Sequence, residues 1–297
     1  MEKGKLLALN QSGLIPGPGE SEEEFLQRSE YCRELHQHIK SVLPEADQVE
    51  SLSQNILMQS APLTASLYDF SCRWIPLYFS NSKLSYWHGG CAWIFQETKD
   101  SPTGAILQLR KALAASDSLF FGLYKRTELI AHELAHAGRM QFQEPKYEEL
   151  LAYQTSSSPF QRYFGPIVQS SAESMIFLLV LLTIFLLDIF LLFSPEYLLL
   201  GKAAWLKLIP LGMVLYAWRR LGKRHKQFNA CLQQLQAISN QPKACIYRLT
   251  DREIDLFAEM TPTQILDYAS RQEELRWQLI KESYLKNTYG VAGHCPD

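Results

Sequence analysis

The chain has 297 residues, of which 47% are hydrophobic and 20% charged, and its formal net charge at pH 7 is −2. This composition is that of a globular protein, and its length allows two domains. Because positive charge is not in excess, we expect no nucleic-acid partner.

The N-terminal part predicts a lead segment followed by a helix. Residues 1–9 are too short for a secretory signal peptide, so we expect the N-terminus to stay in the compartment where it is made. Residues 13–19 contain two prolines and three glycines, which is typical of a flexible lead. A helix over residues 22–43 should follow, since Ser21 and Glu24 have the spacing of a capping box.

Three short apolar and aromatic segments predict strands at residues 72–79, 91–95 and 118–124. Together they would form a small sheet packed on the helix that follows. An edge strand can bind an extended peptide by main-chain pairing, and either of the first two segments could be that edge. His88 and Cys91 flank a Gly-Gly pair, which predicts a turn rather than a cysteine nucleophile.

The most informative feature is the sequence His-Glu-Leu-Ala-His that begins at His132. On a helix, His132 and His136 lie on one face, where both imidazoles can reach one metal ion with Glu133 beside them. Two neutral imidazole ligands and a carboxylate base are the arrangement of zinc hydrolases. The surrounding residues are uncharged, Thr127 is the expected N-cap, and Gly138 is the expected end of this helix.

A catalytic zinc ion takes three protein ligands and keeps a fourth position open. The third ligand should come from the next helix, which carries Glu148 and Glu149. Either carboxylate can bind, depending on which one faces the histidines. The connection to this helix is short, and Glu144 and Pro145 provide a suitable break.

Glu149 and Ala152 form a Glu-x-x-Ala sequence, and with it residues 118–155 resemble the gluzincin metallopeptidases. The resemblance implies a zincin-like fold in which His132, His136 and Glu149 are the zinc ligands. It also implies that Glu133 is the general base.

The chain departs from the gluzincin pattern at Tyr153, where the family usually has Asp or Asn to orient a ligand histidine. Another group, such as Glu148 or Glu128, would then have to orient it. A further donor should stabilise the oxyanion of the reaction. The candidates are Tyr147, Tyr153, Tyr163 and Arg139.

Residues 175–193 are almost entirely Leu, Ile, Phe, Val and Met. As a helix they would measure roughly 28 Å, the thickness of a bilayer core. A second, weaker apolar segment follows at residues 198–218, and the two predict a transmembrane helical hairpin. Asp188 lies in the first segment, and we expect it to pair with Lys202, Lys207 or a neighbouring chain.

Five basic residues directly follow the second apolar segment. They are Arg219, Arg220, Lys223, Arg224 and Lys226. Positive charge beside a span stays cytoplasmic, so a hairpin would place both the N- and C-termini in the cytoplasm. The six cysteines have irregular spacing and form no disulfide pattern, which agrees with that compartment.

Residues 219–297 predict a cytoplasmic helical region. One helix should begin after Thr250, and another should begin at Thr261 and run through Trp277. Some membrane-anchored relatives of the resembled family place their third ligand after a transmembrane hairpin. Glu253 is therefore a distant second candidate to Glu149.

The predicted fold class is α+β, a mainly helical zincin-like metallopeptidase domain with a small sheet, plus the hairpin and the C-terminal helical region. The expected divisions are residues 1–60, 61–170, 174–218 and 219–297. The predicted function is that of a membrane-anchored zinc metallopeptidase facing the cytoplasm, with peptide or protein substrates that lie in or reach the membrane. The alternative is a membrane-anchored scaffold with a structural or inactive metal site. Iron or manganese would also suit these ligands.

Overall fold

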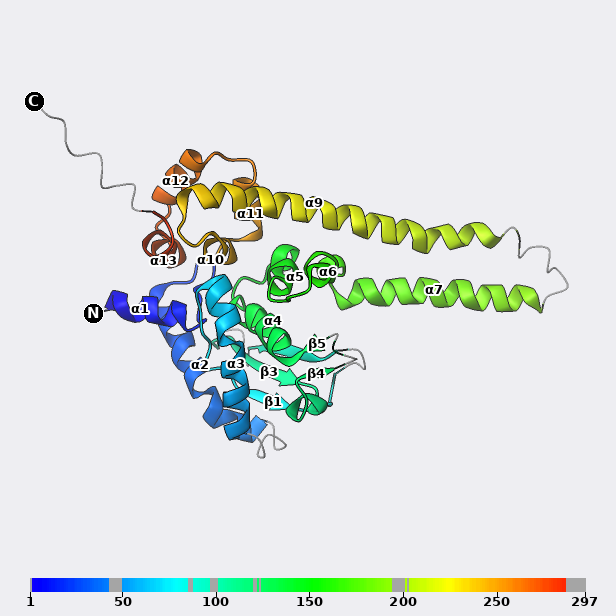
Figure 1. The fold of residues 1–297 in the computed structure, drawn as a ribbon, viewed down its shortest axis with the longest axis horizontal. Helices are drawn as coiled ribbons and strands as arrows, with labels where there is room; N and C mark the ends of the chain where they lie inside the picture. Colours follow the sequence, from blue (N-terminus) through cyan, green and yellow to red (C-terminus); the bar gives the residue numbers. More distant parts are fainter. Residues whose placement is uncertain are drawn as a thin grey trace, which may run out of the picture.

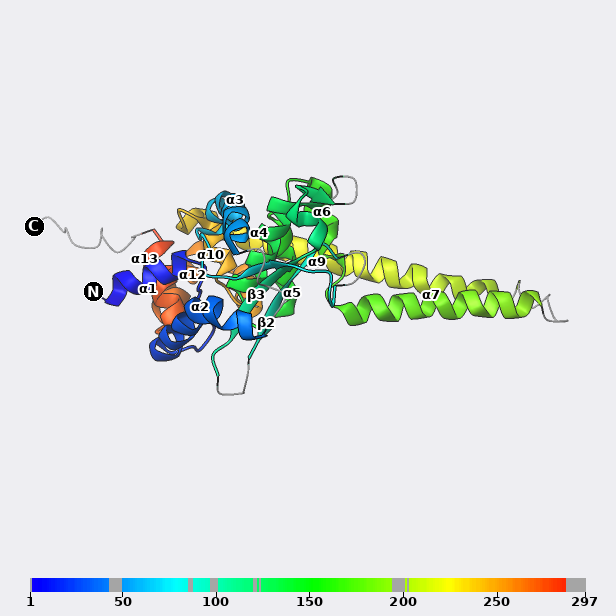
Figure 2. The same ribbon diagram turned by 90° about the horizontal axis from the view of Figure 1, so that it is seen from below.

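The computed structural model describes residues 2–42, 50–84, 88–96, 101–119, 122, 124–193, 201 and 203–286. This part of the chain is mainly helical with a small sheet, which confirms the α+β class. A body of helices and strands carries two long antiparallel helices that extend away from it (Figures 1 and 2). The apolar core of the body takes residues from both ends of the chain.

Three helices form the N-terminal part of the body: α1 (Glu2–Gln11), α2 (Glu22–Val42) and α3 (Glu50–Tyr68). The structure confirms the helix predicted over residues 22–43, which is α2. The Ser21 N–H donates to Glu24 at 2.8 Å, as a capping box requires. The prediction that residues 13–19 form a flexible lead is wrong, because Leu14 and Ile15 are buried in the core. Helix α3 was not predicted, and it runs across the division expected at residue 60.

The sheet has the order β1-β3-β2, with β1 (Leu77–Phe79) parallel and β2 (Gly90–Phe95) antiparallel to β3 (Gly104–Leu109). Strands β1 and β2 lie within or next to predicted strands, but the buried central strand β3 was not predicted. The third prediction was wrong: residues 118–124 are not one strand. They contain β4 (Ser118–Leu119) and pair with β5 (Tyr124–Lys125) around a turn at Gly122, whose φ of 85° interrupts the apolar run.

Helix α4 (Arg126–Gly138) carries the histidines and packs on α3 and the sheet, with α5 (Pro145–Tyr153) beside it. The expected start at Thr127 was wrong by two positions, since Lys125 is the N-cap and its side chain makes no capping bond. The predicted end at Gly138 is confirmed. A side chain there would meet the hydroxyl of Tyr247, which approaches this glycine closely. Pro145 starts α5 as predicted.

The remaining short helices connect and close the body. They are η2 (Lys111–Ala114), α6 (Pro159–Phe164), η3 (Gly165–Ile167), α10 (Pro242–Tyr247), α11 (Asp251–Phe257), α12 (Pro262–Ser270) and α13 (Leu275–Ser283). Thr250 forms the capping box of α11 and Thr261 that of α12, as predicted. The prediction of a single helix from Thr261 through Trp277 is wrong, because this segment forms two helices. The break between α12 and α13 lets Arg276 and Trp277 turn inward to a buried carboxylate, Glu253.

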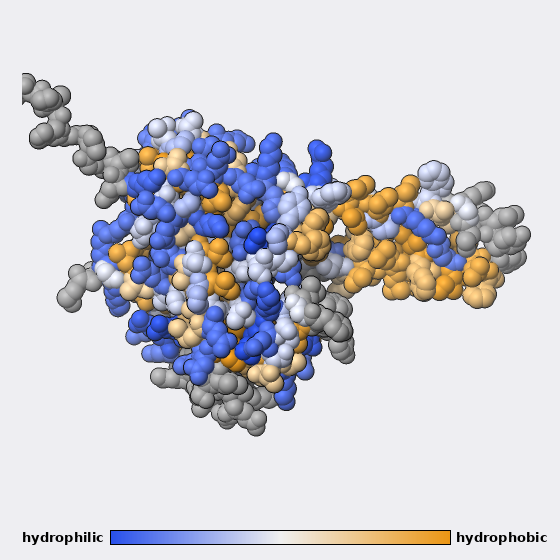
Figure 3. Space-filling model, viewed as in Figure 1, coloured by the Kyte–Doolittle hydropathy of each residue, from blue (hydrophilic) through white to orange (hydrophobic). Residues whose placement is uncertain are grey.

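Two helices extend from the body, α7 (Ser171–Leu192) and α9 (Leu208–Ile238), with η4 (Ala204–Lys207) before α9. Their surface is strongly apolar, whereas most of the visible body surface is polar (Figure 3). Among the described residues, one helix, Ala172–Leu192, is long and apolar enough to cross a membrane. The second expected span, residues 198–218, lies partly outside the described residues, and its described part does not qualify. Asp188 pairs with Lys207 at 3.0 Å, as predicted.

Candidate metal centre

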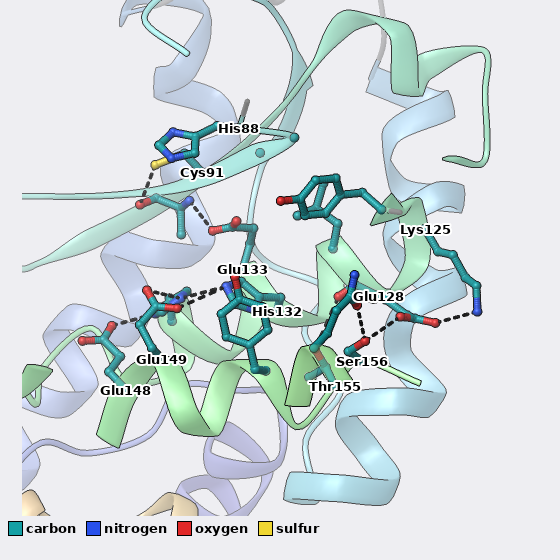
Figure 4. Close-up of a pocket in the computed structure, with 18 of the residues that line it drawn as sticks. His88, Cys91, Lys125, Glu128, His132, Glu133, Glu148, Glu149, Thr155 and Ser156 are labelled. Atoms are coloured by element: carbon teal, nitrogen blue, oxygen red, sulfur yellow. Dashed lines mark hydrogen bonds and ion pairs between the residues drawn. The ribbon is translucent and has the colours of Figure 1, made fainter. Parts of the chain in front are cut away.

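The three predicted ligands meet at one point between α4 and α5. The Nε2 atoms of His132 and His136 lie 3.3 Å apart. Glu149 places one carboxylate oxygen 3.7 Å from His132 Nε2 and the other 3.6 Å from His136 Nε2. This confirms that the spacing brings the histidines together and that Glu149, rather than Glu148, faces both (Figure 4).

These separations fit a tetrahedral metal ion. Zinc binds nitrogen and oxygen at about 2.0–2.1 Å, so two ligand atoms of a tetrahedral site lie roughly 3.3–3.4 Å apart. The separation of the two histidine nitrogens is at this value, and each nitrogen lies a few tenths of an ångström further from a different oxygen of Glu149. One donor atom from each of the three residues lies within 4.8 Å of the other two. The donor set of two imidazoles and one carboxylate also suits zinc, iron or manganese, and it leaves a fourth position open.

A second set of contacts orients the histidine rings. Glu148 lies 2.8 Å from His136 Nδ1, on the side of the ring opposite the metal-facing nitrogen. His132 hydrogen-bonds to the main chain of Ala152. Of the two candidates expected to orient a histidine in place of Tyr153, Glu148 is therefore the one that contacts a histidine. The other candidate, Glu128, instead accepts hydrogen bonds from Ser156 and Ser157.

Glu133 is buried beside the ligands and is held by the sheet. One of its carboxylate oxygens accepts the N–H of Ala92 on β2 at 2.8 Å. Burial raises the pKa of Glu133 to about 7, against the lowering effects of His136 and the Ala92 N–H. A carboxylate with a pKa near neutrality is well suited to accept and then return a proton.

The two histidines differ in protonation. Burial and the neighbouring His136 keep the pKa of His132 well below its ordinary value. For His136, burial acts to lower the pKa, but the carboxylates of Glu148, Glu149 and Glu133 outweigh it and raise the pKa to about 9. A metal ion bound here would meet a neutral His132 but would have to displace a proton from His136.

The metal centre lies in a cleft of about 410 Å³ between α4, α5 and β2. β2 is an edge strand of the sheet and lines this cleft. In an antiparallel pair, alternate residues direct their main-chain groups away from the partner strand. The Ala92 N–H points to Glu133, so Gly90, Ala92 and Ile94 present the free edge of β2 to the cleft.

Of the four expected oxyanion donors, one lies in the cleft. Tyr153 lines it, with its ring 4.6 Å from that of His132. The Tyr147 hydroxyl instead donates to Asp255, and the Arg139 guanidinium donates to main-chain oxygens of the C-terminal part. Tyr163 lies outside the cleft, with its ring stacked on His225.

Two other expectations are resolved by position. Glu253 is wrong as a ligand, because it is buried against Arg276 at 2.8 Å and accepts a hydrogen bond from Trp277. His88 lines the cleft that also holds Glu149. Neither His88 nor the Ala92 main chain was predicted as part of the site. Only the strand pattern of β2 hinted at the second of these.

Comparison with protein-family models, with curated proteins and with solved structures finds no match to this chain. The class of site is therefore argued from its own geometry.

Proposed function

We propose that the protein is a zinc-dependent metallopeptidase of gluzincin type. The observation that carries this proposal is the convergence of His132, His136 and Glu149, one donor atom from each within 4.8 Å of the others, with the buried carboxylate of Glu133 beside them. Zinc held by these ligands would supply a Lewis acid for a substrate carbonyl and a water activated for attack. A purely structural zinc site usually fills all four positions with protein ligands.

The residues of the chain have separate tasks in this proposal. Glu133 accepts a proton from the attacking water and returns it to the leaving amine, for which its raised pKa is suited. Glu148 holds the His136 ring in place. Tyr153, beside His132 in the cleft, is the candidate donor to the developing oxyanion.

An extended peptide would bind along the free edge of β2. Its carbonyl oxygen would take the Ala92 N–H, which Glu133 occupies in this structure. Substrate binding would then release the Glu133 carboxylate from the strand. Peptide pairing and the freeing of the base would therefore be one event.

We further propose that α7 anchors the protein in a membrane. α7 leads away from the body and α9 returns to the same core, so a crossing by α7 requires a return crossing before residue 221. The pair of Asp188 and Lys207 lies at the far end of the hairpin, where it would meet the opposite interface. The basic cluster on α9 favours a cytoplasmic body.

The test uses the full chain purified in detergent. We expect about one zinc per chain by elemental mass spectrometry and cleavage of an unbiased peptide mixture by mass spectrometry. Glu133→Gln should keep the zinc and lose activity by about 10²–10⁴-fold. Glu259→Gln, an exposed carboxylate of the body, is the matched control and should change neither. Zinc binding with no cleavage of any peptide would favour the scaffold with a structural metal site.

A further inference from the structure

Helix α6 lies at the end of the body from which the hairpin extends (Figures 1 and 2). It carries three exposed aromatic rings that form a cluster. Phe160 is 69% exposed, and Tyr163 and Phe164 are 39% and 36% exposed. The rings touch one another, with centroids 4.9 Å apart for Phe160–Phe164 and for Tyr163–Phe164. A contiguous exposed apolar patch of this kind marks a surface that binds something.

The cluster is held outward by a rigid support. The Ser158 side chain caps α6 by accepting the Gln161 N–H, and Arg162 donates to the Ser156 carbonyl. The Tyr163 ring stacks on His225 of α9 at 4.5 Å, and the His225 Nε2 atom lies 2.9 Å from the main-chain carbonyl oxygen of Tyr163. The rings are therefore a fixed feature of the body, tied to the base of the hairpin.

Three exposed cations lie on α9 at the base of the hairpin: Arg219, Lys223 and Lys226. All three line one cleft at the base of the hairpin. None of them forms an ion pair or hydrogen bond with any residue that the structure describes. Arg220, in contrast, is neutralised by Glu173 at 2.6 Å. The cleft that they line at the base of the hairpin thus carries positive charge.

We propose that the aromatic cluster of α6 and these three cations form one docking surface for the headgroup region of an anionic bilayer. Aromatic rings concentrate at membrane interfaces, and Lys and Arg near the surface attract anionic lipid. The surface is continuous with α7, which begins at Ser171, only seven residues after Phe164. The inference rests on the membrane anchor proposed above.

Docking of α6 would fix the position of the candidate metal site relative to the membrane surface. Gln161 is on the same helix as the aromatic cluster and lines the metal cleft, where it contacts Ser156. With the outer face of α6 in the headgroups, the cleft opens beside the membrane surface. The substrate class is then the extended segment of a membrane protein just outside the bilayer, which the edge of β2 can pair with as it leaves the lipid.

The test places a photoreactive p-benzoylphenylalanine at single positions of the full chain in nanodiscs that contain phosphatidylglycerol. Position 160 probes the docking surface, and position 182, where Leu182 is 53% exposed on α7, probes the anchor. Position 58, where Met58 is 37% exposed on α3, is the control. We expect lipid adducts at positions 160 and 182 and none at position 58.

Each other pattern overturns a stated part. A lipid adduct at 182 without one at 160 overturns the docking surface and leaves the anchor. No adduct at either position overturns both. A protein adduct at 160 in intact cells, in place of lipid, assigns the cluster to a protein partner instead. The readout needs neither zinc nor catalysis, so its failure is distinct from that of the metallopeptidase proposal.

The role of the three cations is tested by changing the lipid composition of the nanodiscs. In the wild-type chain, we expect the adduct at position 160 to be several-fold more frequent with phosphatidylglycerol than with phosphatidylcholine. The combined Arg219→Gln, Lys223→Gln and Lys226→Gln variant should lose this preference and keep the adduct at position 182. Equal labelling from both lipids in the wild-type chain would remove the anionic part of the proposal.

Discussion

The metal cleft and the hairpin use burial in opposite ways. In the cleft, the side chains of His136 and Glu133 are largely buried, and each has a specific partner, Glu148 for His136 and the Ala92 N–H for Glu133. On the hairpin, large apolar side chains are exposed, and the ion pair of Asp188 and Lys207 stands among them. Single substitutions should therefore act strongly in the cleft, where geometry is specific, and weakly on the hairpin, where the interaction is with a medium.

The largest effect should follow from removal of a ligand. His132→Ala leaves two donors, His136 and Glu149, so we expect the zinc content of the purified chain to fall from about one to near zero. His88→Ala is the control, because His88 lines the same cleft outside the ligand triangle. Zinc retained by His132→Ala, or lost equally in both variants, would contradict the ligand assignment.

A matched pair of leucines compares the two regions directly. Leu150 of α5 is fully buried, and Leu182 of α7 is 53% exposed. Leu150→Ala should lower the free energy of unfolding of the body by about 2–5 kcal/mol, since it leaves a cavity beneath the ligand helix. Leu182→Ala should change it by less than about 0.5 kcal/mol. Denaturant titration of the full chain in micelles measures both changes. Similar losses of unfolding free energy in the two variants would contradict the difference between the two regions.

Much of this cleft was predictable because its residues are close in sequence. His132 and His136 share a helical face by spacing alone, and the following helix had to bring a carboxylate. The choice of Glu149 over Glu148 depended on the angle between two helices, which no local pattern specifies. The Ala92 N–H is a main-chain group and leaves no signal in the side-chain sequence.

The misses in the fold have related physical causes. β3 is buried on both sides, so it lacks the alternation of apolar and polar residues that identifies a half-exposed strand. The apolar run at 118–124 looked like one strand, but the positive φ of Gly122 turns it back on itself. Leu14 and Ile15 lie among prolines and glycines, where composition favours a loop although tertiary contacts bury them.

A smaller effect tests the ring-orienting contact. Glu148→Gln keeps the shape of the side chain but removes the charge that faces His136 Nδ1. Above about pH 9, where His136 has lost its proton in both chains, we therefore expect zinc affinity to fall by about 10–100-fold. Glu128→Gln is the matched control on α4, since that carboxylate contacts serines and not the histidines. Competition with a chelator of known affinity measures both. Equal affinities would show that Glu148 does not orient the ligand.

The smallest effect, about tenfold per pH unit, concerns the proton on His136. Its raised pKa of about 9 means that zinc must displace this proton below that pH. Apparent zinc affinity should therefore rise by about tenfold for each pH unit from about 7 to about 9 and level off above. An unperturbed histidine would level off near its ordinary pKa of about 6.5. Because the Glu148 carboxylate is one cause of the raised pKa, Glu148→Gln should move the plateau to lower pH. A plateau that does not move would mean that Glu149 and Glu133 alone hold the proton on His136.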